Sequence, residues 1–116
     1  MPNVIIYHNP KCTKSRQTLA LIEEAGIKPK VIEYLRNPPT VNELAAILKK
    51  LKITVRELMR KNESVYKELD LADESLSERI LLKAMVEHPI LIERPIVING
   101  NKACLGRSPE NVLEIL

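Results

Sequence analysis

Two cysteines, Cys12 and Cys104, are the side chains of this sequence best suited to nucleophilic or redox chemistry. Cys12 lies between a short β-favouring run, Val4–Tyr7, and a stretch in which apolar residues recur at helical spacing, so we expect it where a strand ends and a helix begins. Reactive groups gather at such junctions in open α/β sheets. Only the thiolate is nucleophilic and the pKa of an ordinary cysteine is ~8.5, so this role requires a lowered pKa.

The residues around Cys12 offer several ways of lowering its pKa. Unpaired N–H groups at a helix start favour an anion, nearby cations favour it further, and a hydroxyl can donate a hydrogen bond to it. His8 would add a positive charge when protonated. The expected N–H donors are Thr13, Lys14 and Ser15, the expected cations are Lys11, Lys14 and Arg16, and the expected hydroxyl is that of Ser15.

Ser15 stands where a Cys-x-x-Cys redox motif would have its second cysteine. A monothiol mechanism follows, in which the second electron-donating thiol comes from Cys104 or from an external thiol. Cys104 lies in an apolar strand segment, where free cysteines are more often inert core residues, so we leave it out of the catalytic set. A zinc site from His8, Cys12, His88 and Cys104 is disfavoured because neither paired ligand motif is present, and we expect no metal.

Arginine suits an oxyanion substrate, because its planar fork binds two oxygens and keeps its charge at neutral pH. Arg94 and Arg107 stand out because each interrupts a β segment or its exit. The pattern alone favours Arg60 as a solvated charge near the end of a short helix. A tyrosine-phosphatase-like loop is disfavoured, because Thr18 stands where such a loop has its arginine and Arg16 comes too early.

Composition narrows the class of protein. A chain of 116 residues with 45% hydrophobic and 28% charged residues predicts a single globular domain spanning residues 1–116. The net charge is only +3, and basic and acidic residues are interspersed along the chain. Trp and Phe are absent, and both observations argue against a nucleic-acid partner. No apolar run is long enough for a membrane span or a signal-peptide core, so we expect a cytoplasmic protein in a reducing compartment.

The elements that must position Cys12 follow a recognisable order. A first β-α-β unit precedes a helical middle section, and a β-hairpin and a last helix end the chain. This is the thioredoxin-like order, and it predicts an α/β fold with a mixed four-stranded sheet flanked by helices and an inserted helical section. The signals are strands at Val4–Tyr7 and Val31–Leu35, a helix stop at Gly26, helix starts at Thr40, Thr54, Ser75 and Ser108, and the hairpin of Ile96–Ile98 and Lys102–Leu105 about Asn99-Gly100-Asn101.

Five stretches of the sequence together resemble the glutaredoxin-coupled arsenate reductase family. They are His8–Arg16, Glu93–Val97 and Gly106–Pro109, with Leu58–Lys61 and the terminal Pro109–Leu116 in support. The likeness covers essentially the whole chain. A lone Cys-x-x-Ser would be weak, whereas separated motifs in the same order are specific for the family.

The resemblance implies a mechanism and the residues that carry it. Cys12 would attack arsenate, glutathione would thiolate the adduct as a co-substrate, and glutaredoxin would reduce it and release arsenite. No tightly bound cofactor, metal or nucleotide is implied. By the same resemblance, Arg60, Arg94 and Arg107 bind the substrate and product oxyanions, the Arg94-Pro95 bond is cis, and His8 and Asn9 help shape the nucleophile loop. We count Ser15 and Pro95 with them as supporting residues.

Two other functions compete with arsenate reduction. A non-enzymatic thiol-stress transcription regulator of the Spx type would share this fold and bind RNA polymerase. Ser15 argues against that reading, because many such regulators carry Cys-x-x-Cys as their switch. The third reading keeps Cys12 catalytic in glutathione-dependent thiol transfer to another acceptor.

Overall fold

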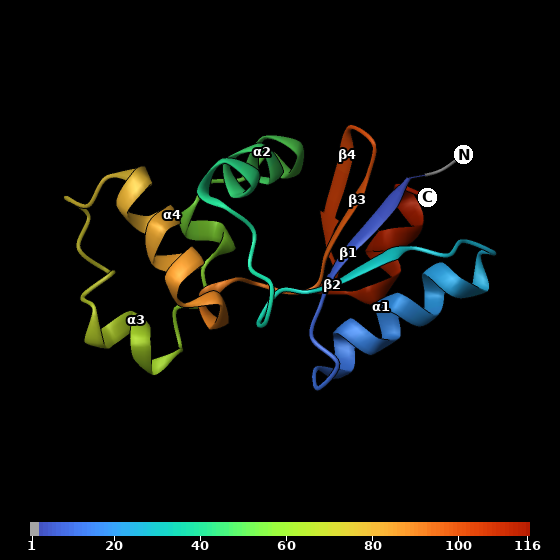
Figure 1. Cartoon of the computed structure of the whole chain (residues 1–116), viewed down its shortest axis with the longest axis horizontal. Coiled ribbons are helices and arrows are strands. Elements are labelled where there is room, and N and C mark those ends of the chain that lie inside the picture. Colours follow the sequence, from blue (N-terminus) through green and yellow to red (C-terminus); the bar gives the residue numbers. More distant parts are fainter. Residues whose placement is uncertain (1–2) are drawn as a thin grey trace. The chain divides into compact units, whose positions relative to one another are not determined.

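The computed structural model describes residues 3–116, and by its contacts the chain divides into two compact units (Figure 1). Unit 1 comprises residues 3–37 and 94–116, and unit 2 comprises residues 38–93. The expected single domain over residues 1–116 stays a prediction, because compactness does not decide whether the units fold together. The elements are β1 (Val4–His8), α1 (Thr13–Glu24), β2 (Lys30–Glu33), α2 (Val41–Leu51), η1 (Arg56–Leu58), α3 (Ser64–Glu68), α4 (Glu78–Glu87), η2 (Pro89–Leu91), β3 (Ile96–Asn99), β4 (Lys102–Leu105) and η3 (Pro109–Glu114), where η marks a 3₁₀ helix.

Unit 1 is built on a four-stranded sheet with the strand order β2-β1-β3-β4. β1 pairs with β2 in parallel and with β3 antiparallel, and β3 pairs antiparallel with β4. The parallel pair needs a crossover connection, which α1 supplies, whereas the β3–β4 pair needs only a tight turn. The mixed, helix-flanked, thioredoxin-like sheet predicted from the sequence is therefore confirmed.

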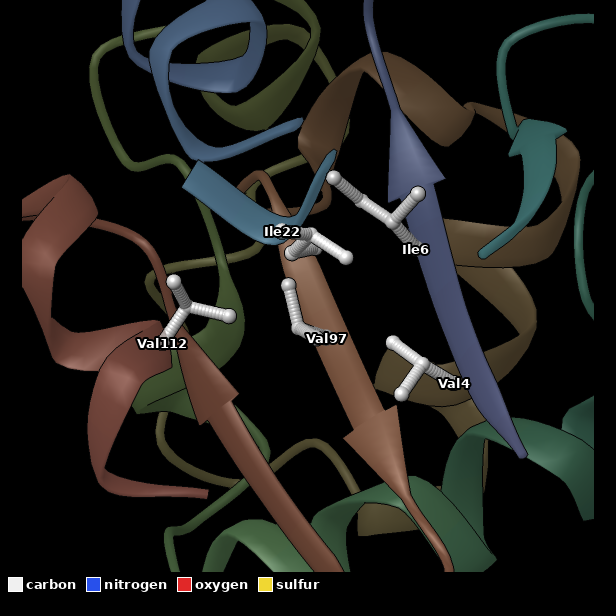
Figure 2. Close-up of a cluster of buried hydrophobic side chains, with 5 residues drawn as sticks. All are labelled: Val4, Ile6, Ile22, Val97 and Val112. Atoms are coloured by element: carbon white, nitrogen blue, oxygen red, sulfur yellow. The ribbon is translucent and has the colours of Figure 1, made fainter. Parts of the chain in front are cut away.

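A small apolar core joins α1 and η3 to one face of this sheet (Figure 2). Val4 and Ile6 point to that face from alternate positions of β1, and Val97 faces it from β3, where it is the registered partner of Ile6. Ile22 from α1 and Val112 from η3 complete the cluster, and each of the five is at most 3% exposed. Burial of such side chains contributes about 1.5–3 kcal/mol each, so this cluster fixes α1, and with it Cys12, against β1.

Several residues that the sequence marked as turn or capping residues adopt the predicted structures. The chain after α1 turns at Gly26 with φ of +80°, and the β3–β4 turn places Gly100 at φ of +62°, backbone conformations that glycine adopts at little cost. Thr40 forms a complete capping box with Glu43 at the start of α2. Thr54 and Glu57 form the same reciprocal pair, and the short helix that follows is η1.

Three predictions about individual elements differ from the structure. β2 ends at Glu33 instead of Leu35, because its partner β1 ends at the registered residue His8 and pairing stops there. α4 is capped by Ser77, whose hydroxyl accepts from the Ile80 N–H, while Ser75 instead bonds Asp73. The last helix begins at Pro109 as expected but is a 3₁₀ helix.

Unit 2 holds the predicted inserted helical section, and several apolar side chains of α2 and α4 are buried, among them Leu44, Leu81 and Met85. α2 packs against α4, and α4 against η2. Two extended residues, Met59 and Ile92, form an isolated antiparallel bridge, flanked by hydrogen bonds from the Arg60 N–H to Leu91 O and from the Glu93 N–H to Leu58 O. Within residues 3–116, no helix has the length and apolar character needed to span a bilayer.

Candidate active site

Cys12 occupies the N-cap position of α1, with an extended backbone at φ −95° and ψ 123°. Its N–H donates to Asn9 O at 3.0 Å, and its carbonyl accepts from the Arg16 N–H at 3.0 Å. The turn so closed holds Pro10 and Lys11 at its tip. The predicted helix start directly after Cys12 is confirmed, and the side chain is partly exposed.

The pKa of Cys12 lies below its ordinary value because favourable contacts outweigh partial burial. Burial alone would raise it, since an apolar surrounding disfavours the thiolate. The Ser15 N–H, the charge of Arg94, the Lys14 N–H and a hydrogen bond from the Arg94 side chain all lower it. Of the three expected N–H donors, Ser15 and Lys14 therefore lower the pKa of Cys12 and Thr13 does not, and the cation that lowers it is Arg94 rather than a neighbour in sequence.

The Ser15 hydroxyl supports the nucleophile loop instead of the thiol. Ser15 is fully buried; its Oγ lies 2.7 Å from His8 Nδ1 and accepts from the Asn9 N–H at 3.0 Å. Asn9 Oδ1 in turn accepts from the Lys11 N–H at 3.0 Å. The end of β1, the turn and the first turn of α1 are thus linked by one hydrogen-bonded chain that fixes the position of Cys12.

His8 is held in a form that contributes little positive charge at neutral pH. Burial lowers its pKa below the ordinary value, the carboxylate of Glu33 raises it, and the charge of Arg16 lowers it. The net direction is downward, so the imidazole is mostly neutral near pH 7. Arg16 itself is exposed and donates to Pro10 O at 3.1 Å and to Thr13 Oγ1 at 3.3 Å, which braces the turn.

Arg94, whose charge and hydrogen bond act on Cys12, lies at a bend two residues before β3. The Arg94-Pro95 peptide bond is cis, as the family resemblance implied. Pro95 is buried, and its carbonyl accepts from the Gly106 N–H at 2.9 Å. Unit 1 therefore brings together Cys12, Arg94 and Pro95 with the supporting residues His8, Asn9 and Ser15.

The other two arginines of the predicted set lie elsewhere in the chain. Arg107 is an exposed residue of unit 1 in the turn that follows β4. Arg60 belongs to unit 2, where its guanidinium lies 3.5 Å from a Glu63 carboxylate oxygen and 3.9 Å from one of Glu93. Its interpretation as a simply solvated charge is wrong, because it is half-buried between two carboxylates.

Cys104 has the opposite electrostatic setting to Cys12. Burial and the nearby carboxylate of Glu114 raise the pKa of its thiol to about 11. It is partly buried and packs against the apolar core of unit 1, as predicted for its position, and its inertness stays a prediction. Among residues 3–116, no three His, Cys, Asp or Glu side chains are grouped as metal ligands.

Sequence reasoning missed a pocket beside the nucleophile loop. It has a volume of about 420 Å³, and all its lining residues belong to unit 1. Glu33 at the end of β2 and Arg36 in the turn after it gave no signal in the sequence. Charged residues at the end of an edge strand are usually solvated surface residues, so nothing in the pattern marks these two. The lining residues are His8, Asn9, Pro10, Lys11, Glu33, Leu35 and Arg36.

A mixed four-stranded sheet with a partly exposed thiol of lowered pKa at the junction of β1 and α1 defines a thioredoxin-like protein with one cysteine at the start of its first helix. The family model described as the ArsC family matches residues 7–115, and the chain belongs to that family.

The chain is similar to other proteins over nearly its whole length. A protein of Haemophilus influenzae named Arsenate reductase is 57% identical over 115 residues, which span 98% of this chain and 99% of its own. A protein of Escherichia coli K12 named Uncharacterized protein YfgD is 54% identical over 114 residues, spanning 97% and 96%. The structure of an arsenate reductase from Vibrio cholerae is 55% identical with a TM-score of 0.97, covering 99% of this chain and 98% of its own. Relatives with that name support an oxidoreductase.

Proposed function

We propose that this protein reduces arsenate to arsenite, with glutathione as co-substrate and glutaredoxin as the final reductant. The observation that carries the proposal is the contact of Arg94 with Cys12, which pairs a nucleophile of lowered pKa with a cation suited to an oxyanion. The family model and the relatives named Arsenate reductase support the substrate.

The first two steps build an arsenic(V) adduct on Cys12. The thiolate attacks the arsenic atom of dihydrogen arsenate, a sulfur–arsenic bond forms, and one oxygen leaves as water with the two protons of that anion. The thiol of glutathione then replaces a second oxygen, again released as water. Both additions keep arsenic in the +5 state, so no electrons have yet been transferred.

Reduction occurs when the glutaredoxin thiolate attacks the glutathione sulfur of this adduct. The sulfur–arsenic bond breaks, its electron pair passes to arsenic, and a glutaredoxin–glutathione mixed disulfide leaves. Water then displaces Cys12 from arsenic(III), which releases arsenite and restores the thiol. The sum consumes arsenate and two thiols and yields arsenite, one mixed disulfide and water, and Cys104 takes no part.

The arginines would offset the charge of the anions that bind and form at Cys12. We assign Arg94, Arg107 and Arg60 to the oxyanions of substrate and product, since guanidinium groups bind two oxygens and stabilise the charge that gathers during attack. His8, Asn9, Ser15 and Pro95 hold the loop that carries the nucleophile. Because the cycle needs a reduced glutathione pool, we place it in the cytoplasm.

A coupled assay tests the proposal. Purified protein with arsenate, glutathione, glutaredoxin and its reductase should consume NADPH in an arsenate-dependent manner. Cys12→Ser should abolish the signal, and Arg94→Ala should lower kcat by about 10²–10³-fold, the usual loss for one group that stabilises a developing oxyanion.

Matched variants separate chemistry from folding. Cys104→Ala removes the other thiol and Arg79→Ala removes an exposed arginine of α4, and both should retain turnover. A preparation whose Cys12 is alkylatable but which shows no arsenate-dependent NADPH consumption would contradict the substrate. Arsenate-independent reduction of mixed disulfides in that preparation would favour thiol transfer to another acceptor.

A further inference from the structure

The pocket beside the nucleophile loop carries both signs of charge. Lys11 and Arg36 are exposed at its rim, and Glu33 is half-buried in its wall. None of the three takes part in an ion pair with another of residues 3–116. Their charges are therefore available to bind a ligand and are not neutralised by one another.

The turn after β2 fixes the spacing of these charges. The N–H groups of Arg36 and Asn37 both donate to Glu33 O, at 3.0 and 2.9 Å, so the chain reverses at the end of the strand. Leu35 lines the pocket between the two charged residues and adds an apolar surface. The volume of about 420 Å³ falls within the range of about 300–1,000 Å³ that is usual for small-molecule sites.

The other wall of the pocket is the turn that carries the nucleophile. Asn9, Pro10 and Lys11 line it, and the Cys12 N–H closes the same turn by donating to Asn9 O at 3.0 Å. A ligand in the pocket therefore ends at the edge of the turn whose next residue is the thiol. Cys12 follows this turn directly in the chain, at the N-cap position of α1, which makes the pocket a candidate site for a thiol co-substrate.

We propose that this pocket binds glutathione, with Lys11 and Arg36 toward its two carboxylates and Glu33 toward its ammonium group. The assignment deepens the proposed function and rests on it for the role of glutathione as co-substrate. Arsenate fits the pocket less well, because a carboxylate in the wall would repel a multiply charged oxyanion. A zwitterionic peptide uses all three charges.

The test uses S-methylglutathione, which keeps the carboxylates and the ammonium but cannot react with Cys12. A titration followed by the backbone amide signals of the ¹⁵N-labelled protein should move the signals of residues 8–11 and 33–36 and saturate. Arg36→Glu should weaken this binding roughly 3- to 10-fold, as expected for reversal of one exposed charge. Lys28→Glu, an exposed lysine of the same unit outside the pocket, should leave it unchanged.

A second comparison tests the contact with Glu33. Glu33→Gln should weaken binding of S-methylglutathione but not of its N-acetylated form, which lacks the ammonium. The proposal is overturned if the pocket signals stay still at probe concentrations well above about 1 mM, the upper end of ordinary KM values, or if Lys28→Glu weakens binding as much as Arg36→Glu. Because no arsenate or glutaredoxin is present, a failure here is distinct from a failure of the coupled assay.

Discussion

Gly106 packs against the ring of Pro95 so closely that no side chain fits between them. A Cβ at Gly106 would lie 2.6 Å from Pro95 Cγ and 2.7 Å from Thr18 Oγ1. Thr18 is fully buried and cannot yield easily, because its hydroxyl donates to Lys14 O at 2.8 Å. Gly106, which directly follows β4, is thus packed between Thr18 of α1 and Pro95, the residue after Arg94.

Gly106→Ala should therefore disturb the position of Arg94 and raise the pKa of Cys12. The added methyl group must displace Pro95 or Thr18, and overpacking of this kind costs about 1–3 kcal/mol of the free energy of unfolding. With Arg94 displaced, the thiolate loses a stabilising charge, so its pKa rises. The rate of alkylation by iodoacetamide, measured against pH, should have its midpoint at higher pH than in the unchanged protein.

Gly100→Ala is the matched control for this variant. Gly100 has φ of +62° and no atom within 4 Å of an added Cβ, so alanine there strains the backbone by about 1–2 kcal/mol without crowding any neighbour. Stability should fall in both variants, whereas the alkylation midpoint should move only in Gly106→Ala. Equal midpoints in the two variants would show that Gly106 acts on stability alone.

Arg94→Ala should move the alkylation midpoint of Cys12 to higher pH, and Lys14→Ala should leave it in place. The charge and hydrogen bond of Arg94 favour the thiolate, so their removal raises the pKa and slows alkylation at any pH below the new midpoint. Lys14 acts through its backbone N–H, which alanine retains. If the midpoint moved in Lys14→Ala and not in Arg94→Ala, the cation that stabilises the thiolate would be the Lys14 side chain, and the role given to Arg94 would be wrong.

Ser15→Ala should destabilise the protein by about 1–3 kcal/mol, because it leaves buried polar groups of the nucleophile loop without a partner. Both His8 Nδ1 and the Asn9 N–H would lose the Ser15 hydroxyl. Chemical denaturation measures the change. The control is Ser75→Ala, an exposed serine bonded only to Asp73, which should change stability by less than about 0.5 kcal/mol.

Cys104 should resist alkylation in the folded protein at pH 8. Its pKa of about 11 keeps it a thiol there, whereas the lowered pKa of Cys12 gives that residue more thiolate. Mass spectrometry should find one adduct on the native protein, at Cys12, and a second only after denaturation. Because folding raises the pKa of Cys104, its contribution to stability should be complete below the unfolded pKa and decrease as pH rises toward 11. Rapid labelling of both cysteines in the native protein would contradict the raised pKa of Cys104.

Local patterns in the sequence determined much of the fold. The strand before Cys12, the helix start after it, the Thr40 capping box and the Gly100 hairpin turn all follow from neighbours a few residues apart. The error at Ser75 is of the same local kind. Ser75 and Glu78 have capping-box spacing, but Asp73 takes the Ser75 hydroxyl and Ser77 becomes the cap.

The electrostatic setting of Cys12 was decided only by the tertiary structure. The sequence pointed to Lys11, Lys14 and Arg16 because they are close along the chain, yet strand order and register bring Arg94 to the thiol instead. The same is true of the pocket charges at Glu33 and Arg36, which meet the nucleophile turn because β2 pairs in parallel with β1. Spacing in a sequence sets which residues share a helix or strand, whereas contacts between distant segments depend on how the strands pair and pack.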